Sequence, residues 1–404
     1  DALEAAIAQV VAAADVQRDQ DDERFARGLS AWLDAGRPTG ALWTVEQVLE
    51  RLAAPLLKEG KDRKLLVLLL DGMAWGNAAE LLLDLEDRER GALAPLRYRP
   101  GRLSRLPPVL AALPTVTAVS RAALFAGRLL RPGDPEDTSR DPDRFARHTG
   151  LGRVVGAGTN EPLLLLRPDV ETESGSVQRR VLQEIAGERR VVGVVVNAID
   201  DQLHGSKQLR VRYTLETVKM LPDLLQAAAA AGRAVLVVSD HGHVPGARLG
   251  SVGRRPDASS RWRRLGADEA PRDGELALGQ EGVWRPRGTA RVAVLYRETE
   301  TYGAQVAEGQ HGGASLAEVV VPLLLLGAAD LGERLGDDRD METAPFERPG
   351  WWELEPAPAA APRGEAPETK IDTRLETKPE TKIDAKPGGK DTPQLSLLPE
   401  PRRA

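Results

Sequence analysis

The chain has 404 residues, and 41% of them are hydrophobic, so it is long enough to bury the core of one large domain with appendages, in two or three structural units. Its 55 basic and 61 acidic residues give a formal net charge of -6, which argues against bulk attraction to nucleic acid but leaves room for a local basic site. Cysteine is absent, which excludes disulfides and thiolate ligands and leaves histidines and carboxylates as metal ligands.

No apolar run approaches the roughly 18 to 20 residues of a membrane-spanning helix, so we expect a soluble protein without a membrane partner. No basic segment followed by an apolar segment opens the chain, which predicts a cytoplasmic location. The first residue is Asp1 and not a methionine, which is compatible with a fragment of a longer protein.

Residues 1–58 predict a helical N-terminal segment, because alanine and leucine dominate and charges recur at helical spacing. Within it, Thr44 and Gln47 form a capping-box pattern at the start of a helix.

Residues 59–330 are expected to form the main domain. Short apolar runs typical of buried strands occur at 65–70, 191–196, 234–238, 292–296 and 319–326. Helical stretches such as 215–231 lie between most of them. This alternation predicts an α/β fold with a mainly parallel sheet covered by helices on both faces, whose ligands bind beyond the carboxyl ends of the strands.

After this domain the periodicity fades. We expect residues 331–355 to be a linker in which Trp351 and Trp352 make one last docking contact. Residues 356–404 contain repeated Glu-Thr-Lys units, many prolines and almost no aromatic residues, which predicts a disordered low-complexity tail.

The strongest local motif is Ser239-Asp240-His241-Gly242-His243, directly after the apolar run 234–238. Asp-His-Gly by itself is equally compatible with a turn that ends a strand. Asp71 similarly ends the run 65–70 and precedes Gly72; an isolated Asp-Gly is usually a turn, but the helical pattern that follows argues against a hairpin.

Two further histidines lie near predicted strand ends. His204 follows Asp200 by four residues, a spacing that places both on one face of a helix but that also suits a surface pair. His311 precedes Gly312 and Gly313, which would let the backbone approach a metal or an anion; alternatively it caps the next helix. His148 lies in a polar stretch and is interpreted as a solvated surface residue.

A nucleophile is available in the segment 113–121, where Thr115, Thr117 and Ser120 surround the start of a predicted helix that ends near Gly127. A helix N-terminus favours an alkoxide or a phosphate. For an isolated threonine, an N-cap role is the better interpretation.

In order and spacing, these residues resemble the alkaline-phosphatase superfamily, and in particular the PglZ domain, over roughly residues 62–327. The resemblance implies a three-layer α/β sandwich that hydrolyses phosphoesters with two divalent ions. Zinc is the first choice on ligand type, and manganese is the alternative. By this resemblance, one ion is bound by Asp200, His204 and His311, and the other by Asp71, Asp240, His241 and the hydroxyl of Thr117.

The same resemblance implies Thr117 as the nucleophile, favoured over Thr115 because it stands ten residues before Gly127, with Ser120 as a fallback. PglZ proteins act in bacterial phage-defence systems of the BREX and Pgl type, so other defence proteins are expected partners. The substrate is expected to be a phosphoester, with a nucleotide or a nucleic acid as candidates. The alternative is a metal-binding scaffold in a defence complex, without turnover.

Six arginines, together with Trp262, occur between two of these motifs: Arg248, Arg254, Arg255, Arg261, Arg263 and Arg264. Such a loop could bind phosphate or stack a base, but a solvated loop in an arginine-rich protein is the favoured interpretation.

Overall fold

The computed structural model describes residues 2–38, 40, 42–58, 60–87, 93–98, 108–156, 158–197, 212–246, 249–253, 257–303, 309–328 and 341–343. All of them belong to one compact unit, Asp1–Glu347. The predicted Trp351–Trp352 contact and the predicted tail after 355 lie outside the described residues. None of the helices in the described part of the chain is both long and apolar enough to cross a membrane.

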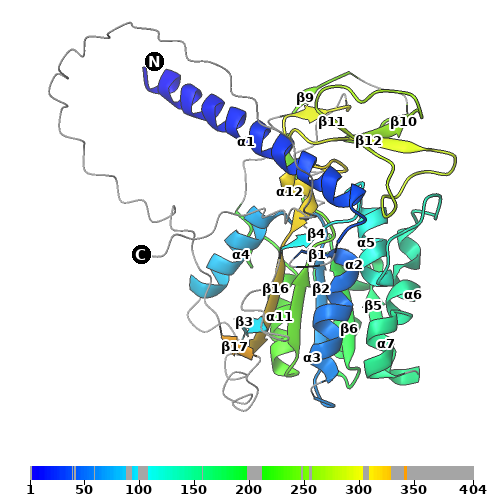
Figure 1. The fold of residues 1–404 in the computed structure, drawn as a ribbon. Coiled ribbons are helices and arrows are strands. Elements are labelled where there is room, and N and C mark those ends of the chain that lie inside the picture. Colours follow the sequence, from blue (N-terminus) through cyan, green and yellow to red (C-terminus); the bar gives the residue numbers. More distant parts are fainter. Residues whose placement is uncertain are drawn as a thin grey trace, which may run out of the picture. The chain divides into compact units, whose positions relative to one another are not determined.

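A seven-stranded sheet forms the centre of this unit (Figure 1). Its strands, in spatial order, are β17 (Met341–Thr343), β3 (Leu93–Tyr98), β16 (Leu323–Ala328), β7 (Ala234–Val238), β2 (Leu65–Leu70), β6 (Val191–Val196) and β5 (Leu163–Leu165). The four strands from β7 to β5 are parallel, whereas β16 is antiparallel to both of its neighbours. The predicted α/β class with a mainly parallel sheet is therefore confirmed.

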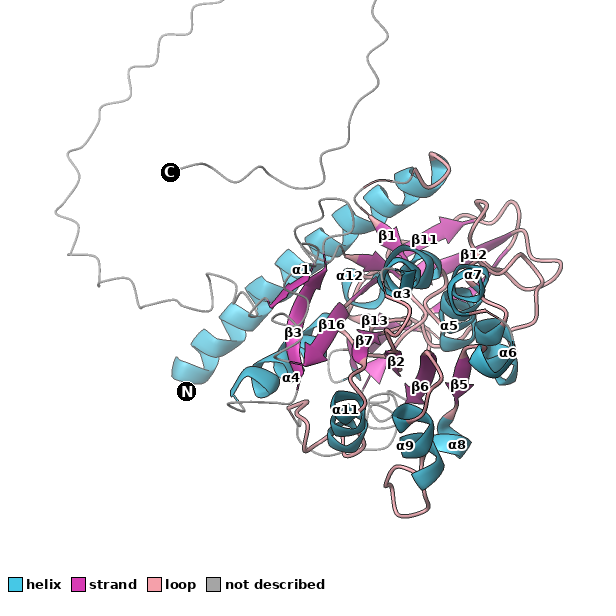
Figure 2. Ribbon diagram, turned by 90° about the horizontal axis from the view of Figure 1, so that it is seen from below, coloured by secondary structure: helices cyan, strands magenta, loops and turns pink. Residues whose placement is uncertain are grey.

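Helices cover both faces of the sheet, as the view in Figure 2 shows. One face packs against α2 (Val45–Val48), η1 (Leu49–Ala53), α3 (Ala54–Lys58), α5 (Thr117–Ala126), α6 (Asp141–Ala146) and α7 (Thr149–Val155). The other face packs against α4 (Trp75–Asp87), α8 (Arg167–Val170), α9 (Arg179–Ala186) and α11 (Leu221–Ala230).

Residue alternation along the strands explains the three layers. In β2, Leu65, Val67 and Leu69 belong to the first of these cores, while Leu66, Leu68 and Leu70 belong to the second. Successive side chains of a strand point to opposite faces, so a run that is apolar throughout requires cover on both sides.

Two predicted strands differ from the structure. The run 292–296 forms β12 (Arg291–Leu295), which pairs with β10 (Trp262–Leu265) and β11 (Glu275–Leu278) in a separate antiparallel sheet. The run 319–326 is divided: α12 (Leu316–Val319) ends inside it, β15 (Val320–Val321) joins a small sheet, and β16 begins only after Pro322. Proline has no backbone N–H to donate to a ladder, so it separates the two strands.

The remaining short elements connect these layers. They are β1 (Trp43–Thr44), β4 (Val109–Leu110), η3 (Thr138–Arg140), η4 (Gly158–Asn160), β8 (Val244–Pro245), β9 (Gly250–Ser251), β13 (Glu300–Thr301) and β14 (Gly309–Gln310).

The long helix α1 (Ala2–Asp34) is attached to the body through its second half, while its first half projects away from the sheet (Figure 1). Leu29 and Leu33 are buried against the small antiparallel sheet. Asp22, which is only 2% exposed, accepts hydrogen bonds from the backbone N–H groups of Glu298 and Leu316. Burial raises the pKa of Asp22 to about 7, and the nearby Glu298 adds to this effect.

The raised pKa of Asp22 predicts a pH-dependent contribution to stability. Because the folded state holds the proton more tightly than the unfolded state, this contribution is fully present below about pH 4 and is lost as the pH rises to about 7. The free energy of unfolding of the wild type, minus that of Asp22→Asn, should fall by roughly 1.4 kcal/mol per pH unit across this window. Urea unfolding at several pH values measures it, and a pH-independent difference would refute the prediction.

A buried ion pair supports the loop that carries His311. Glu318 and Arg261 are both fully buried, and they are joined by hydrogen bonds of 2.8 Å and 2.9 Å. Glu318 also accepts hydrogen bonds from the backbone N–H groups of Gly313 and Ser315, and the bond from Ser315 is part of the capping box of α12. The carboxylate thus fixes the loop to the small sheet.

Glu318→Ala should therefore reduce the free energy of unfolding by about 3–5 kcal/mol, because it leaves the Arg261 guanidinium buried without its partner. Glu188→Ala is the matched control: Glu188 also pairs with a base, Lys64, but its side chain is 93% exposed. That variant should be nearly as stable as the wild type. Equal losses in the two variants, measured by urea unfolding, would contradict this role.

Candidate active site

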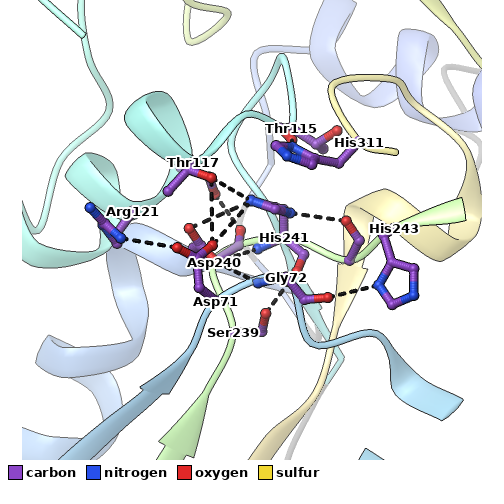
Figure 3. Close-up of polar contacts among 12 residues, drawn as sticks. Asp71, Gly72, Thr115, Thr117, Arg121, Ser239, Asp240, His241, His243 and His311 are labelled. Carbon is purple, nitrogen blue, oxygen red and sulfur yellow. Dashed lines mark hydrogen bonds and ion pairs between the residues drawn. The ribbon is translucent and has the colours of Figure 1, made fainter. Parts of the chain in front are cut away.

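Three buried side chains meet at the carboxyl ends of two neighbouring strands (Figure 3). Asp71 directly follows β2, and Asp240 and His241 follow β7 after Ser239. Because β2 and β7 are parallel and adjacent, their ends lie at the same edge of the sheet. The atoms of Asp71, Asp240 and His241 that could bind a metal ion all lie within 4.8 Å of one another.

The local backbone holds this arrangement. The backbone N–H groups of Gly72 and His241 both donate to Asp240 Oδ1, at 3.4 Å and 3.1 Å. A Cβ atom at Gly242 would collide with the carbonyl oxygen of Ala317, so this position requires glycine. The Asp-His-Gly motif is therefore both a turn that ends a strand and the carrier of the site.

Thr117 is the first residue of α5, and its hydroxyl faces this cluster (Figure 3). Thr117 Oγ1 lies 2.9 Å from His241 Nε2 and 3.5 Å from Asp71 Oδ1. Val116 is the N-cap of the helix, so Thr117 does not have the N-cap role considered from the sequence.

Hydrogen bonds to carbonyl groups orient the histidines. Nδ1 of His241 lies 3.0 Å from the carbonyl oxygen of Gly242, and Nδ1 of His311 lies 3.0 Å from that of Thr115. A carbonyl oxygen only accepts, so Nδ1 carries the proton and the lone pair of the neutral ring is on Nε2. This is the usual arrangement of a histidine that binds a metal through Nε2.

His311 also belongs to this region, because its ring stacks on that of His241 with 3.9 Å between the ring centroids. Asp200 and His204, the other two residues expected to bind the same ion as His311, lie outside the described residues. The structure therefore brings together Asp71, Thr117, Asp240, His241 and His311.

The other two candidate hydroxyls are engaged elsewhere. Ser120 Oγ is fully buried, donates to the carbonyl oxygen of Asp240 at 2.6 Å and accepts from the N–H of Ala112. Thr115 Oγ1 donates to the carbonyl oxygen of Gly313 at 2.8 Å and accepts from the N–H of Gly312. Both therefore hold the backbone in place.

Arg121 and Asn197 belong to the site although the sequence analysis gave them no role. Arg121 is 6% exposed and bonds Asp71 Oδ2 at 3.0 Å and Asp141 Oδ2 at 2.9 Å, while the Asn197 amide donates to Asp71 Oδ2 at 2.8 Å. Burial lowers the pKa of Arg121, but the surrounding carboxylates outweigh it and raise the pKa overall. The available signals were the four-residue spacing of Thr117 and Arg121 and the position of Asn197 directly after β6.

Two other interpretations need correction. His148 is 1% exposed and not solvated; its Nδ1 accepts from the N–H of Leu151 and caps α7, and burial lowers its pKa. In the arginine cluster, Arg261 and Arg263 are buried in ion pairs with Glu318 and Glu275 and are not part of a solvated or phosphate-binding loop. Arg264 is exposed, and Arg248, Arg254 and Arg255 lie outside the described residues.

The donor set fits a divalent cation. Asp71, Asp240 and His241 offer two carboxylates and one imidazole Nε2, which are typical ligands of zinc and manganese, and all three are at most 1% exposed. Buried carboxylates this close together require a positive charge nearby. Arg121 supplies one such charge to Asp71 but bonds Asp141 as well.

A comparison with known protein families matches one part of this chain. Residues 169–326 match the model of an alkaline phosphatase-like domain. That model describes the BREX system PglZ alkaline phosphatase-like domain, so the resemblance found in the sequence is confirmed over these residues. No curated protein matches the chain.

The fold is similar to several solved structures, all at low sequence identity. Murine ectonucleotide pyrophosphatase/phosphodiesterase 5, in an inactive form in complex with AMP, has 12% identity and a TM-score of 0.40 over 72% of this chain and 98% of that protein. The human form has 13% identity and a TM-score of 0.40, over the same shares of the two chains. Phosphonoacetate hydrolase from Sinorhizobium meliloti 1021 has 13% identity and a TM-score of 0.35, over 65% and 90% of the two chains.

The cluster predicts which substitutions reduce metal content. Changing both Asp240→Asn and His241→Ala should remove at least one zinc or manganese ion per chain, because two of the three clustered donors are lost. His243→Gln is the matched control: His243 lies in the same motif, but its Nδ1 bonds the carbonyl oxygen of Gly72 and it is not in the cluster. Elemental analysis after dialysis against the metal measures the result, and unchanged content in the double variant would exclude this site.

Proposed function

We propose that this chain hydrolyses phosphoesters, either monoesters or diesters, with Thr117 as the nucleophile. The observation that carries the proposal is the position of the Thr117 hydroxyl, 2.9 Å from His241 Nε2 and facing two buried carboxylates at the edge of the sheet. A hydroxyl is activated as a nucleophile when an adjacent base accepts its proton or when a bound cation lowers its pKa.

Two divalent ions, zinc being the first choice, would act at this site. Asp71, Asp240, His241 and the Thr117 hydroxyl would hold one of them, and His311 with Asp200 and His204 would hold the other. Bound ions would supply Lewis-acid charge that lowers the pKa of the hydroxyl and stabilises the attacking and leaving oxygens.

The residues of the chain have distinct tasks in this reaction. In the first step, a bond forms between Thr117 Oγ1 and phosphorus while the bond from phosphorus to the leaving oxygen breaks; the hydroxyl proton passes to solvent, and solvent protonates the leaving oxygen. In the second step, the oxygen of a water molecule forms a bond to phosphorus while the bond from phosphorus to Thr117 Oγ1 breaks, and a proton of that water restores the hydroxyl. The N-terminus of α5 favours the negative charge of the phosphoryl group. Arg121 and Asn197 hold Asp71 in position through hydrogen bonds to its Oδ2.

The match to the BREX system PglZ domain supports a role in phage defence. We therefore also propose other defence proteins as partners, a cytoplasmic location, and a nucleotide or nucleic acid as the phosphoester. Copurification of defence proteins with the chain, with and without Asp240→Asn, tests whether assembly depends on an intact site. Assembly of a fully metallated protein that hydrolyses no monoester or diester would favour the scaffold alternative.

Thr117→Ala should abolish turnover of generic phosphomonoesters and phosphodiesters while leaving most of the bound metal and the fold in place. The fold should persist because Thr117 is not the cap of α5 and its side chain is only half-buried, so the lost hydroxyl and methyl group contribute little to packing. Thr117→Ser should retain part of the activity, because the hydroxyl remains but loses the methyl group that restricts its rotamer.

The control for this experiment is Thr115→Ser, which keeps a hydroxyl that holds the backbone of the same segment. Its turnover should stay close to that of the wild type. If Thr117→Ala hydrolyses as fast as the wild type, a metal-bound water is the attacker, and the covalent mechanism is wrong although the metal site stands.

A further inference from the structure

A cavity of about 790 Å³ lies at the end of α5 that is opposite to Thr117. The end of α1, the start of α2, the segment after Gly127 and the loop at Gly282 line it. Because α5 has 10 residues and a helix rises about 1.5 Å per residue, Thr117 and the cavity are roughly 15 Å apart along the helix. The cavity is therefore separate from the candidate active site, and its volume is in the range of pockets that bind small molecules.

One of the residues that line the cavity has a buried hydroxyl without a hydrogen-bond partner among the described residues. Thr44 lines the cavity and is 4% exposed, and its Oγ1 makes no hydrogen bond to any residue that the structure describes. The capping box expected from Thr44 and Gln47 is wrong in this respect: Thr44 is the N-cap of α2, but its side chain makes no cap hydrogen bond. A buried hydroxyl in this state is costly unless a ligand supplies the missing bond.

Two arginines at the cavity are available for an anion. Arg131 makes no side-chain hydrogen bond or ion pair with the described part of the chain, and it is exposed. Arg128 is 60% exposed, and its ion pair with Asp134 is long, at 3.5 Å, so that pair contributes little. The guanidinium fork suits a phosphate group. Glu281 is the carboxylate among the described lining residues.

The wall of the cavity next to these arginines contains a residue in an unfavourable backbone conformation. Arg37 has a φ of 58°, an unfavourable value for a residue other than glycine. In this conformation its guanidinium bonds Glu46 at 2.7 Å and lies 5.2 Å from the centre of the Trp32 ring. Gly282 has a φ of 89°, and a Cβ there would crowd Arg37 and Leu129. Trp32, Leu33, Leu42 and Leu130 give the cavity an apolar surface.

We propose that this cavity binds a small organic phosphate of nucleoside monophosphate size. Its phosphate contacts Arg128 and Arg131 at the mouth, its uncharged part packs against Trp32 and the leucines, and one of its polar atoms bonds the Thr44 hydroxyl. This proposal does not depend on hydrolysis at Thr117, because the two sites share no residue.

AMP is the probe, titrated by calorimetry into the Asp240→Asn protein so that turnover does not consume it. Arg128→Ala with Arg131→Ala should weaken binding by about tenfold or more, since charge-assisted hydrogen bonds are lost. Arg180→Ala, which removes another exposed arginine, is the matched control and should leave binding unchanged. Adenosine and inorganic phosphate should each bind far more weakly than AMP.

Thr44→Val separates a ligand role from a structural one. It removes a hydroxyl that has no partner in the described structure while keeping the shape of the side chain, so the ligand-free protein should melt at the same or a higher temperature. Its affinity for AMP should nevertheless fall about fivefold or more. The proposal is overturned if AMP does not bind, or if the arginine double variant and Thr44→Val bind it as tightly as their parent.

Discussion

The proximity of two carboxylates at the ends of neighbouring parallel strands is the constraint on which the candidate site depends. Asp71 and Asp240 are buried together because β2 and β7 are paired in register and end at the same edge. Two negative charges at this distance, with little water, are unfavourable unless cations compensate them. Arg121 provides part of that compensation within the fold, and under the proposed function a metal ion would supply the rest.

Helix α5 connects the site to the rest of the domain. Its first residue, Thr117, presents a hydroxyl to His241, and Arg121, one turn later, bonds Asp71 and Asp141. Its middle is buried in the core on one face of the sheet, which fixes its direction. After the helix ends at Gly127, the next residues of the chain line the cavity of about 790 Å³. One packed helix therefore positions polar groups at both of its ends.

The loop that carries His311 is fixed by contacts from three separate segments. Glu318 ties it to Arg261, the hydroxyl of Thr115 bonds the backbone of Gly312 and Gly313, and Asp22 bonds the N–H of Leu316. Because Asp22 comes from α1, the N-terminal helix helps to hold the segment that follows His311. Loss of these contacts would loosen the position of the imidazole without removing it.

The sequence by itself determined the three central parallel strands and the polar residues that follow them, because apolar runs of this length need cover on both faces of a sheet and ligands bind beyond the carboxyl ends of parallel strands. The runs 65–70, 191–196 and 234–238 agree with β2, β6 and β7 residue by residue. The sequence places Asp71, Asp240 and His241 directly after predicted strands, and the resemblance to the PglZ domain adds Thr117 and His311 to them. Only the tertiary structure decided the positions that depend on partners far along the chain. In the sequence, nothing distinguishes Arg121 from other helical arginines, because its partners Asp71 and Asp141 come from other elements. Arg261 likewise has its partner, Glu318, 57 residues further along the chain. Thr44 has the sequence pattern of a helix cap, but its side chain makes no cap hydrogen bond, because packing and not the local sequence decides where its hydroxyl lies.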